Sequence, residues 1–240
     1  MEDTIYFGGA LFNGADTHFN IYLAEILEKQ KKVLLPQRDG FEFGRLYGAI
    51  LDILPDPTPT KVQTAVQNVI YALDIGVYLR DSNIMLARCD EPLDPGVDVE
   101  QTISRMLGNF NIGYRTDVRS PYGSMDDNFA GMHFFPGFQC DAFIIHPMPN
   151  TSVKEAEKGL ESLAENILES IAEKDNLEKY RYRAPARKCI WEIEEYAKRL
   201  FGGIDDIHSE KGLKEIAQRY VDPENQEFFR QALKPVIKRI

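Results

Sequence analysis

The sequence predicts an α/β protein built on a doubly wound, parallel, five-stranded sheet. Five short apolar runs of four or five residues alternate with longer stretches that have the apolar spacing of helices. Continuous apolar runs are typical of strands that are buried on both faces, and their alternation with helices indicates parallel crossover connections. After about residue 175 only helical spacing remains. We therefore expect an α/β domain at residues 1–174 and an all-helical C-terminal extension at residues 175–240.

The strands are rich in β-branched and aromatic residues, and the first ends in a Gly8-Gly9 turn. The expected strands are Thr4–Gly8, Lys32–Pro36, Asn83–Ala87, Asn111–Tyr114 and Ala142–His146. The expected helices are one capped by Asp16, then Gly44–Leu54, Lys61–Leu79, Val97–Leu107 and Val153–Ala172, and in the extension Ala186–Phe201, Lys211–Tyr220 and Pro223–Ile237. This order is that of Rossmann-like and flavodoxin-like sheets.

The composition and charge of the chain argue against several classes of function. The chain has 28 basic and 38 acidic residues, a formal charge of −10, which argues against a nucleic-acid or anionic-membrane binder. Its three cysteines form no CxxC pair, so we expect neither a disulfide framework nor a zinc site. No stretch approaches 18 uninterrupted apolar residues, and no basic segment precedes an apolar one at the N-terminus. We expect a cytoplasmic protein.

The densest group of carboxylates follows the third expected strand. Residues 89–100 (CDEPLDPGVDVE) carry five carboxylates in twelve residues and open a helix that Asp94 is placed to cap. Ligands bind outside the carboxyl ends of strands in an open parallel sheet, and Glu100 falls in the first two helical turns there. One interpretation is a solvated acidic loop with a helix cap. The other is the paired carboxylates of glycoside chemistry, in which one attacks an anomeric carbon.

Four short motifs carry a resemblance to a known family. They are Ile5-Tyr-Phe-Gly-Gly-Ala-Leu-Phe12, Leu35-Pro-Gln-Arg-Asp-Gly40, the spacing Asp94…Gly96…Glu100, and Ile112-Gly-Tyr-Arg-Thr-Asp117. In this order, over roughly residues 4–170, the chain resembles the nucleoside 2-deoxyribosyltransferases. These enzymes exchange the nucleobase of 2-deoxynucleosides.

The resemblance implies roles for three carboxylates. Glu100 matches the nucleophile that attacks C1′ of the deoxyribose, and Asp94 matches the carboxylate that orients the sugar hydroxyls. Asp74 matches the aspartate that exchanges a proton with the nucleobase, although one extra residue precedes Asn83. Double displacement with retention and ping-pong kinetics should follow, without a metal or other cofactor.

Further positions are implied to bind substrate. Gln37 falls where the family contacts the base, Phe12 where an aromatic ring packs against it, and Gly8, Gly9 and Gly96 lie in the matching motifs. Glycines at the strand end allow the ligand to approach the backbone closely.

The family also borrows an Asn and a Met from a neighbouring subunit, which implies a homo-oligomer with shared sites. Asn128 and Met132 are the candidates, but their spacing is longer than the family's, and Met132 has loop packing as an alternative role.

Two alternatives remain open. An N-glycoside hydrolase of deoxynucleosides or nucleoside 5′-monophosphates would pass the sugar to water, with Arg115 and Arg119 as candidate phosphate ligands. The turn after the first strand has no cation or hydroxyl, which favours unphosphorylated nucleosides. A non-catalytic nucleotide-binding module is the alternative of another class.

Overall fold

The computed structural model describes residues 3–149, 151–175 and 191–232 of the 240-residue chain. The contacts within the chain divide it into two compact units. The sheet unit comprises Met1–Asp39 and Asp81–Ala186, and the helical unit comprises Gly40–Arg80 and Arg187–Ile240. Each unit is continuous in space but is built from two separate stretches of sequence.

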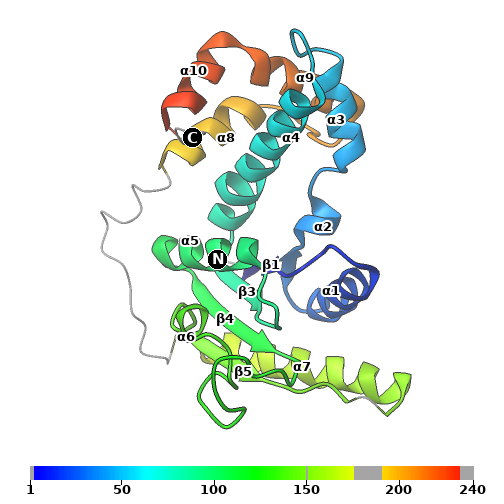
Figure 1. Cartoon of the computed structure of the whole chain (residues 1–240), viewed down its shortest axis with the longest axis vertical. Helices are drawn as coiled ribbons and strands as arrows, with labels where there is room; N and C mark the ends of the chain where they lie inside the picture. The colour runs from blue at the N-terminus through cyan, green and yellow to red at the C-terminus, as the bar shows by residue number, and fades with distance from the viewer. Residues whose placement is uncertain (1–2, 150, 176–190, 233–240) are drawn as a thin grey trace. The chain divides into compact units, whose positions relative to one another are not determined.

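The sheet unit contains the expected five-stranded, all-parallel sheet (Figure 1). Its strands are β1 (Thr4–Gly8), β2 (Lys32–Leu34), β3 (Ile84–Arg88), β4 (Phe110–Arg115) and β5 (Ala142–Ile145). They lie in the order β2-β1-β3-β4-β5, which is the flavodoxin-like order. The predicted doubly wound α/β fold is therefore confirmed, with each strand within two residues of its expected bounds.

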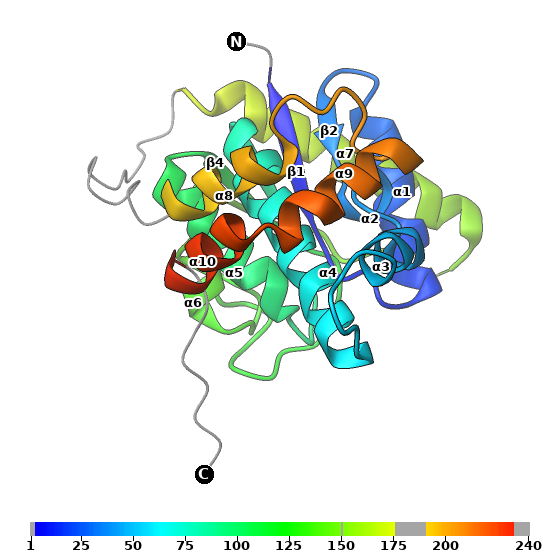
Figure 2. The ribbon, with the colours of Figure 1, turned by 90° about the horizontal axis from the view of Figure 1, so that it is seen from above.

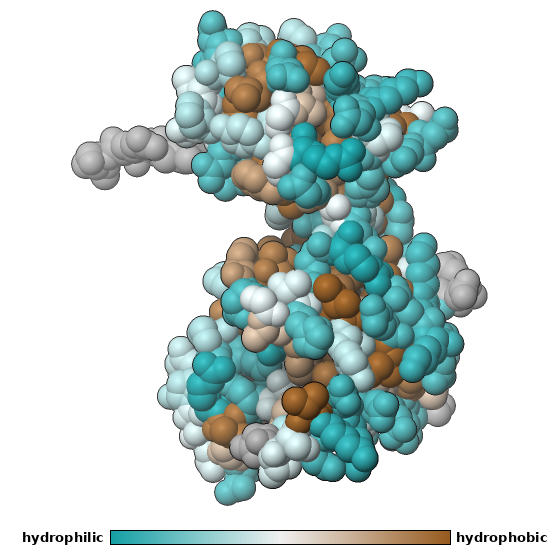
Figure 3. Space-filling model, turned by 90° about the vertical axis from the view of Figure 1, so that its right-hand side faces the viewer, coloured by the Kyte–Doolittle hydropathy of each residue, from teal (hydrophilic) through white to brown (hydrophobic). Residues whose placement is uncertain are grey.

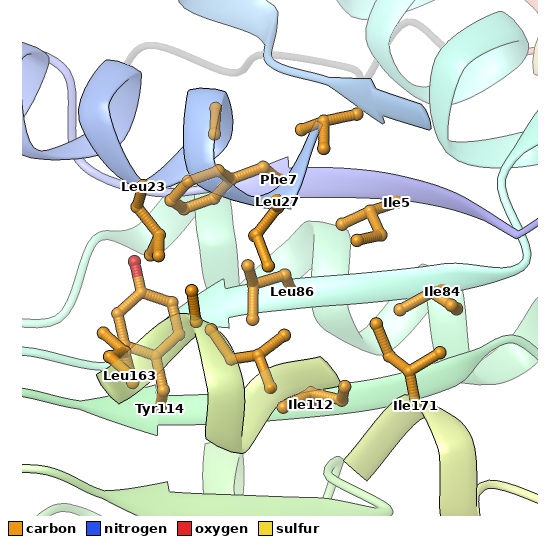
Figure 4. Close-up of a cluster of buried hydrophobic side chains, with 14 of the residues drawn as sticks. Ile5, Phe7, Leu23, Leu27, Ile84, Leu86, Ile112, Tyr114, Leu163 and Ile171 are labelled. Carbon is orange, nitrogen blue, oxygen red and sulfur yellow. The ribbon is translucent and has the colours of Figure 1, made fainter. Parts of the chain in front are cut away.

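Alternate residues of the strands face opposite sides of this sheet. Phe7, Leu86 and Tyr114 point to one side, where they form a buried apolar cluster with Leu23 and Leu163 (Figure 4). Since Leu23 lies on α1 (Gly14–Leu27) and Leu163 on α7 (Val153–Glu173), these two helices cover that face. The alternate strand residues face the other side, which α5 (Pro95–Leu107) covers. β1 and β4 thus supply an apolar face to one layer and a more polar face to the other, with Tyr6, Asn111 and Arg115 on the more polar side.

The helices of the sheet unit are α1 (Gly14–Leu27), α2 (Pro36–Asp39), α5 (Pro95–Leu107), α6 (Phe134–Gly137) and α7 (Val153–Glu173). The expected cap of the first helix was wrong. Asn13 is the N-cap, because its Oδ1 accepts from the amides of Ala15 and Asp16, and Asp16 lies in the first turn instead. The short helices α2 and α6 lie in segments for which no helix was predicted.

The helical unit contains α3 (Phe43–Leu51), α4 (Pro59–Leu73), the π-helix η1 (Asp74–Leu79), α8 (Trp191–Phe201), α9 (Glu210–Val221) and α10 (Pro223–Ala232). Within it, α3 packs on α4 and α9, and α8 packs on α4 and η1 (Figure 2). Asn68 of α4 donates to the Tyr220 hydroxyl of α9 at 2.9 Å, so residues 152 positions apart meet.

This division departs from the boundary expected at residue 174. Residues 40–80 group with the C-terminal helices, because α3 and α4 bury apolar side chains such as Leu46, Ile50 and Val66 within the helical unit. The C-terminal part is helical as expected where it is described. The expected helical residues 186–190 and 233–237 lie outside the described residues.

The surface drawn in Figure 3 is mostly hydrophilic, with hydrophobic residues in small separated patches. Scattered apolar residues of this kind are normal on a folded protein. Among the described residues, no helix is both long and apolar enough to cross a membrane.

Candidate active site

The order in which the chain adds strands to the sheet reverses between β1 and β3, and a cavity opens at this point. The chain leaves β1 toward α1 on one face and leaves β3 toward α5 on the other, so the two loops diverge. A cavity of about 290 Å³ lies between the loops, and Ala10, Asn13, Arg88, Asp90 and Asp94 are among its lining residues. Parallel sheets of this type bind ligands at such switch points. We call this cavity the switch-point crevice.

Glu100 lies on the face of α5 that packs against the sheet. Its Oε1 accepts a hydrogen bond of 2.8 Å from the Tyr6 hydroxyl of β1. Its Oε2 lies only 2.8 Å from the point where a Cβ on Gly8 would stand, and Met85 Cε lies 2.7 Å from the same point. A side chain at Gly8 would therefore displace the Glu100 carboxylate and the end of the Met85 side chain. Gly8 ends β1 next to the loop that lines the crevice.

Asp94 has a structural role and also faces the crevice. Its Oδ1 accepts from the amides of Gly96 at 2.8 Å and Val97 at 3.2 Å, so it is the N-cap of α5. A Cβ on Gly96 would lie 2.9 Å from that oxygen, so the glycine makes room for the cap. Both cap bonds use Oδ1, and Asp94 lines the crevice. Glu100 follows Asp94 by six positions, about 9 Å along the helix axis.

Asp90 holds the acidic loop in place. It accepts from the Thr116 amide and hydroxyl, both at 2.6 Å, from the Asp117 amide at 3.0 Å and from Arg88 Nε at 2.7 Å. Burial opposes ionisation of this carboxyl, but Arg88 and the Thr116 bonds outweigh burial and lower its pKa. Arg88 also lies 3.0 Å from Asp16 and stacks 4.3 Å above the Phe19 ring. The loops after β3 and β4 are thus tied together behind the crevice.

Tyr6 and Asp90 were not predicted from the sequence as parts of the site. Tyr6 lies inside a matched motif, and its position between the apolar-cluster residues Ile5 and Phe7 was enough to place it on the α5 face. The role of Asp90 depends on a pairing with Thr116, 26 residues away, that no local pattern reveals.

Gly9 and Gln37 belong to a polar cluster around the buried Asn20. A Cβ on Gly9 would lie 3.2 Å from the Asn20 amide, which donates to Ala10 O at 2.9 Å and to Gln37 Oε1 at 3.0 Å. Gln37 Nε2 in turn donates to Thr17 O at 3.1 Å. Gln37 therefore ties α2 to α1 beside the loop that carries Phe12. The Phe12 side chain itself is 83% exposed.

The loop between β4 and β5 places its two candidates differently. Asn128 is exposed, whereas Met132 is only 3% exposed and packs inside the sheet unit, as its alternative role requires. Arg115 is fully buried and donates to Asp117 at 2.7 Å and to Ala130 O at 2.5 Å, so it clamps this loop. Arg115 is thus committed to structure, while Arg119, whose side chain is 62% exposed, lines the crevice.

Asp74 lies in the helical unit, at the first residue of η1. Its side chain is partly exposed, and burial raises the pKa of its carboxyl from 3.8 to about 7. The expected continuous helix 61–79 was wrong at this point, because the chain changes from α4 to a π-helix. Gly76 lets η1 approach α8, since a Cβ there would lie 2.7 Å from Ala197 Cβ. π-Helical turns are rare in proteins, and many of those that occur lie at functional sites.

Comparison with models of protein families finds no match to this chain, and comparison with curated proteins finds no match either.

Proposed function

We propose that the protein is a nucleoside 2-deoxyribosyltransferase, which moves 2-deoxyribose between nucleobases through an ester on Glu100. The observation that carries the proposal is the position of the Glu100 carboxylate. Tyr6 orients one oxygen, and the missing side chain of Gly8 leaves room for the other at the carboxyl end of β1. A carboxylate fixed in this way suits attack on an anomeric carbon.

The proposed reaction has two displacements. First, a Glu100 oxygen attacks C1′, the bond between C1′ and the base nitrogen breaks, and Asp74 gives its proton to the departing base. Then a second base loses a proton to Asp74, its nitrogen attacks C1′, and the ester bond breaks to restore the Glu100 carboxylate. The configuration at C1′ is retained after two inversions. Only side chains take part, so the proposed reaction uses no metal or organic cofactor.

The electrostatics of Asp74 and of the crevice support this assignment. A general acid works best when its pKa is near the working pH, and burial brings that of Asp74 to about 7. The crevice is lined by four carboxylates, those of Asp16, Asp90, Glu91 and Asp94, against the two guanidinium groups of Arg88 and Arg119. An excess of negative charge disfavours a phosphate, which supports an unphosphorylated nucleoside as substrate. In the proposal, Asp94 and Gly96 contact the sugar, and Phe12 and Gln37 contact the base.

We further propose that the protein works as a homo-oligomer with shared sites. Asn128 is exposed and is available to a neighbouring subunit, whereas the burial of Met132 leaves it a packing role in its own subunit. The proposed partners of the protein are a 2-deoxynucleoside, a free base and further copies of this chain.

One assay tests the function. The protein is incubated with 2-deoxyinosine and adenine, and the products are separated by chromatography. We expect 2-deoxyadenosine and hypoxanthine in equal amounts. Hypoxanthine with free deoxyribose, whatever base is added, would assign the protein to the hydrolases. The absence of any product would favour the non-catalytic binding module.

Two variants locate the chemistry. Glu100→Gln keeps the shape of the side chain but removes the nucleophilic charge, so exchange should fall by at least about 10³-fold. Glu165→Gln, an exposed position on α7, is the matched control and should exchange at the wild-type rate.

A further inference from the structure

A second cavity, of about 650 Å³, lies on the sheet unit between α5 and the chain around α6. Four rings line it, those of Tyr122, His133, Phe135 and Phe138, and Asp98 of α5 and Gln139 contribute polar groups. We call it the aromatic pocket. Glu100 is not among its lining residues. Its volume is within the range of small-molecule sites, and apolar walls with a few convergent polar groups are typical of such sites.

The rings of this pocket are exposed although they pack on one another. Tyr122, Phe135 and Phe138 are 62–64% exposed. The His133 ring centre lies 5.0 Å from those of Tyr122 and Phe135, and both contacts are edge-on. The His133 Nδ1 accepts from the Phe135 amide at 3.3 Å, which fixes the orientation of the imidazole. Ring faces of this kind attract cations through their negative electrostatic potential.

Two acceptor groups of the pocket, the Asp98 carboxylate and Gln139 Oε1, receive no hydrogen bond from the described residues. Within the described part of the chain, the Asp98 carboxylate makes no hydrogen bond or ion pair. Gln139 Oε1 is buried and likewise has no hydrogen-bond partner in that part. A buried acceptor without a donor is costly, so a ligand that supplies donors to both would be stabilised.

The charge around Asp98 also favours a cation. No lysine or arginine is among the described residues that line the pocket. The nearby Arg105 is occupied by Asp141, at 3.4 Å, and by Gln139 O, at 3.0 Å. Burial raises the pKa of the Asp98 carboxyl, Asp94 and Glu91 raise it further, and His133 lowers it. This carboxylate is therefore destabilised by its surroundings, and a bound cation would relieve the strain.

We infer that the aromatic pocket binds a small organic ammonium ion with an aromatic or other apolar body. Asp98 is its counter-ion, Gln139 Oε1 accepts a second hydrogen bond, and the rings of Tyr122, Phe135 and Phe138 contact the body and the charge. An anion would face an unpaired carboxylate, and a neutral ring would leave that carboxylate unpaired. This inference does not depend on the proposed exchange reaction.

Three probes of similar shape but different charge test whether binding requires a positive charge. Benzylammonium, benzyl alcohol and benzoate are titrated into the full-length protein at neutral pH, and binding is followed by calorimetry and by the His133 ring resonances in proton NMR. We expect saturable binding of benzylammonium with a shift of the His133 resonances, at least about tenfold weaker binding of benzyl alcohol, and no binding of benzoate. Equal binding of all three probes, or no binding of benzylammonium, would overturn the inference.

Matched variants test the residues. Asp98→Asn should weaken benzylammonium binding by about tenfold and leave benzyl alcohol unaffected, whereas Asp126→Asn, an exposed acid in the β4–β5 loop, should change neither. Phe135→Leu should weaken benzylammonium binding by about threefold through the loss of one ring face. Phe135 is 63% exposed, so this second variant should fold even where a change at Asp98 disturbs α5. Unchanged binding by both pocket variants would place the ligand elsewhere.

Discussion

Single atoms decide the geometry around Glu100. The carboxylate lies between the Tyr6 hydroxyl and the empty position that a Gly8 side chain would fill, so one methyl group is enough to move it. Displacement of a reacting group by about 1 Å can cost about 10²-fold in rate. The same methyl group has little effect on the apolar core, which lies on the opposite face of the sheet.

Gly8→Ala should therefore lower the rate of base exchange by at least about tenfold with only a small change in melting temperature. Met85 Cε is the end of a flexible side chain and can move aside, whereas Glu100 is held by Tyr6. Gly14→Ala is the matched control, because a Cβ there meets nothing within 4 Å. Wild-type exchange by Gly8→Ala would show that the position of Glu100 seen here is not the reacting one.

At the scale of elements, α5 combines a structural and a proposed chemical role in Asp94. A cap lost to alanine costs about 1 kcal/mol, but asparagine caps as well as aspartate. Asp94→Asn should therefore keep the melting temperature of the wild type and still lower exchange by at least about tenfold, because the charge that we propose orients the sugar is lost. Asp94→Ala should lower both the melting temperature and the rate of exchange. If Asp94→Asn exchanges bases at the wild-type rate, Asp94 is only a helix cap.

The π-helical element η1 makes a prediction about pH. The carboxyl of Asp74 has a pKa of 3.8 in the unfolded chain and about 7 in the folded protein. Between these values the unfolded chain releases the proton and the folded protein keeps it, so ionisation favours unfolding increasingly as pH rises. This cost is absent below about pH 4 and complete above about pH 7, and solvent around the partly exposed carboxyl limits it to about 2 kcal/mol.

Asp74→Asn removes this cost. The melting temperature of the variant minus that of the wild type should be near zero at about pH 4 and should become positive by about pH 8. Asp52→Asn, an exposed acid in the same unit, should show no such trend. A difference for Asp74→Asn that is the same at every pH would mean that the carboxyl is not protonated in the folded protein.

At the scale of the whole molecule, the strands could be predicted from the sequence because their apolar runs are short, buried and bounded by turns. The cap of α5 could be predicted because Asp94-Pro95-Gly96 is a local pattern. The grouping of residues 40–80 with the C-terminal helices could not, since it depends on contacts between segments more than 100 residues apart, such as Asn68 with Tyr220. Gly76 of η1 likewise packs against Ala197 of α8, more than 100 residues away in the sequence.

For the site, the strand ends predicted the region but not the contacts. Glu100 and Asp94 were predicted as site residues from a motif that resembles a known family, and the structure adds the Tyr6 bond and the close approach of Gly8. The charge of Arg115 made it a candidate phosphate ligand, but its burial and its hydrogen bonds to the loop backbone show that it has a structural role. Sequence patterns indicate which side chains follow a strand. Long-range hydrogen bonds decide which of these side chains have a structural role and which are available to a ligand.

The proposed reaction requires Glu100 to carry the sugar between two bases. The most direct test is to mix the protein with 2-deoxyinosine without an acceptor base, quench the reaction in acid and analyse its peptides by mass spectrometry. We expect one added 2-deoxyribosyl group on Glu100, which disappears when adenine is added before the quench and is absent from Glu100→Gln. Turnover by Glu100→Gln at the wild-type rate, or an adduct on another residue, would contradict it.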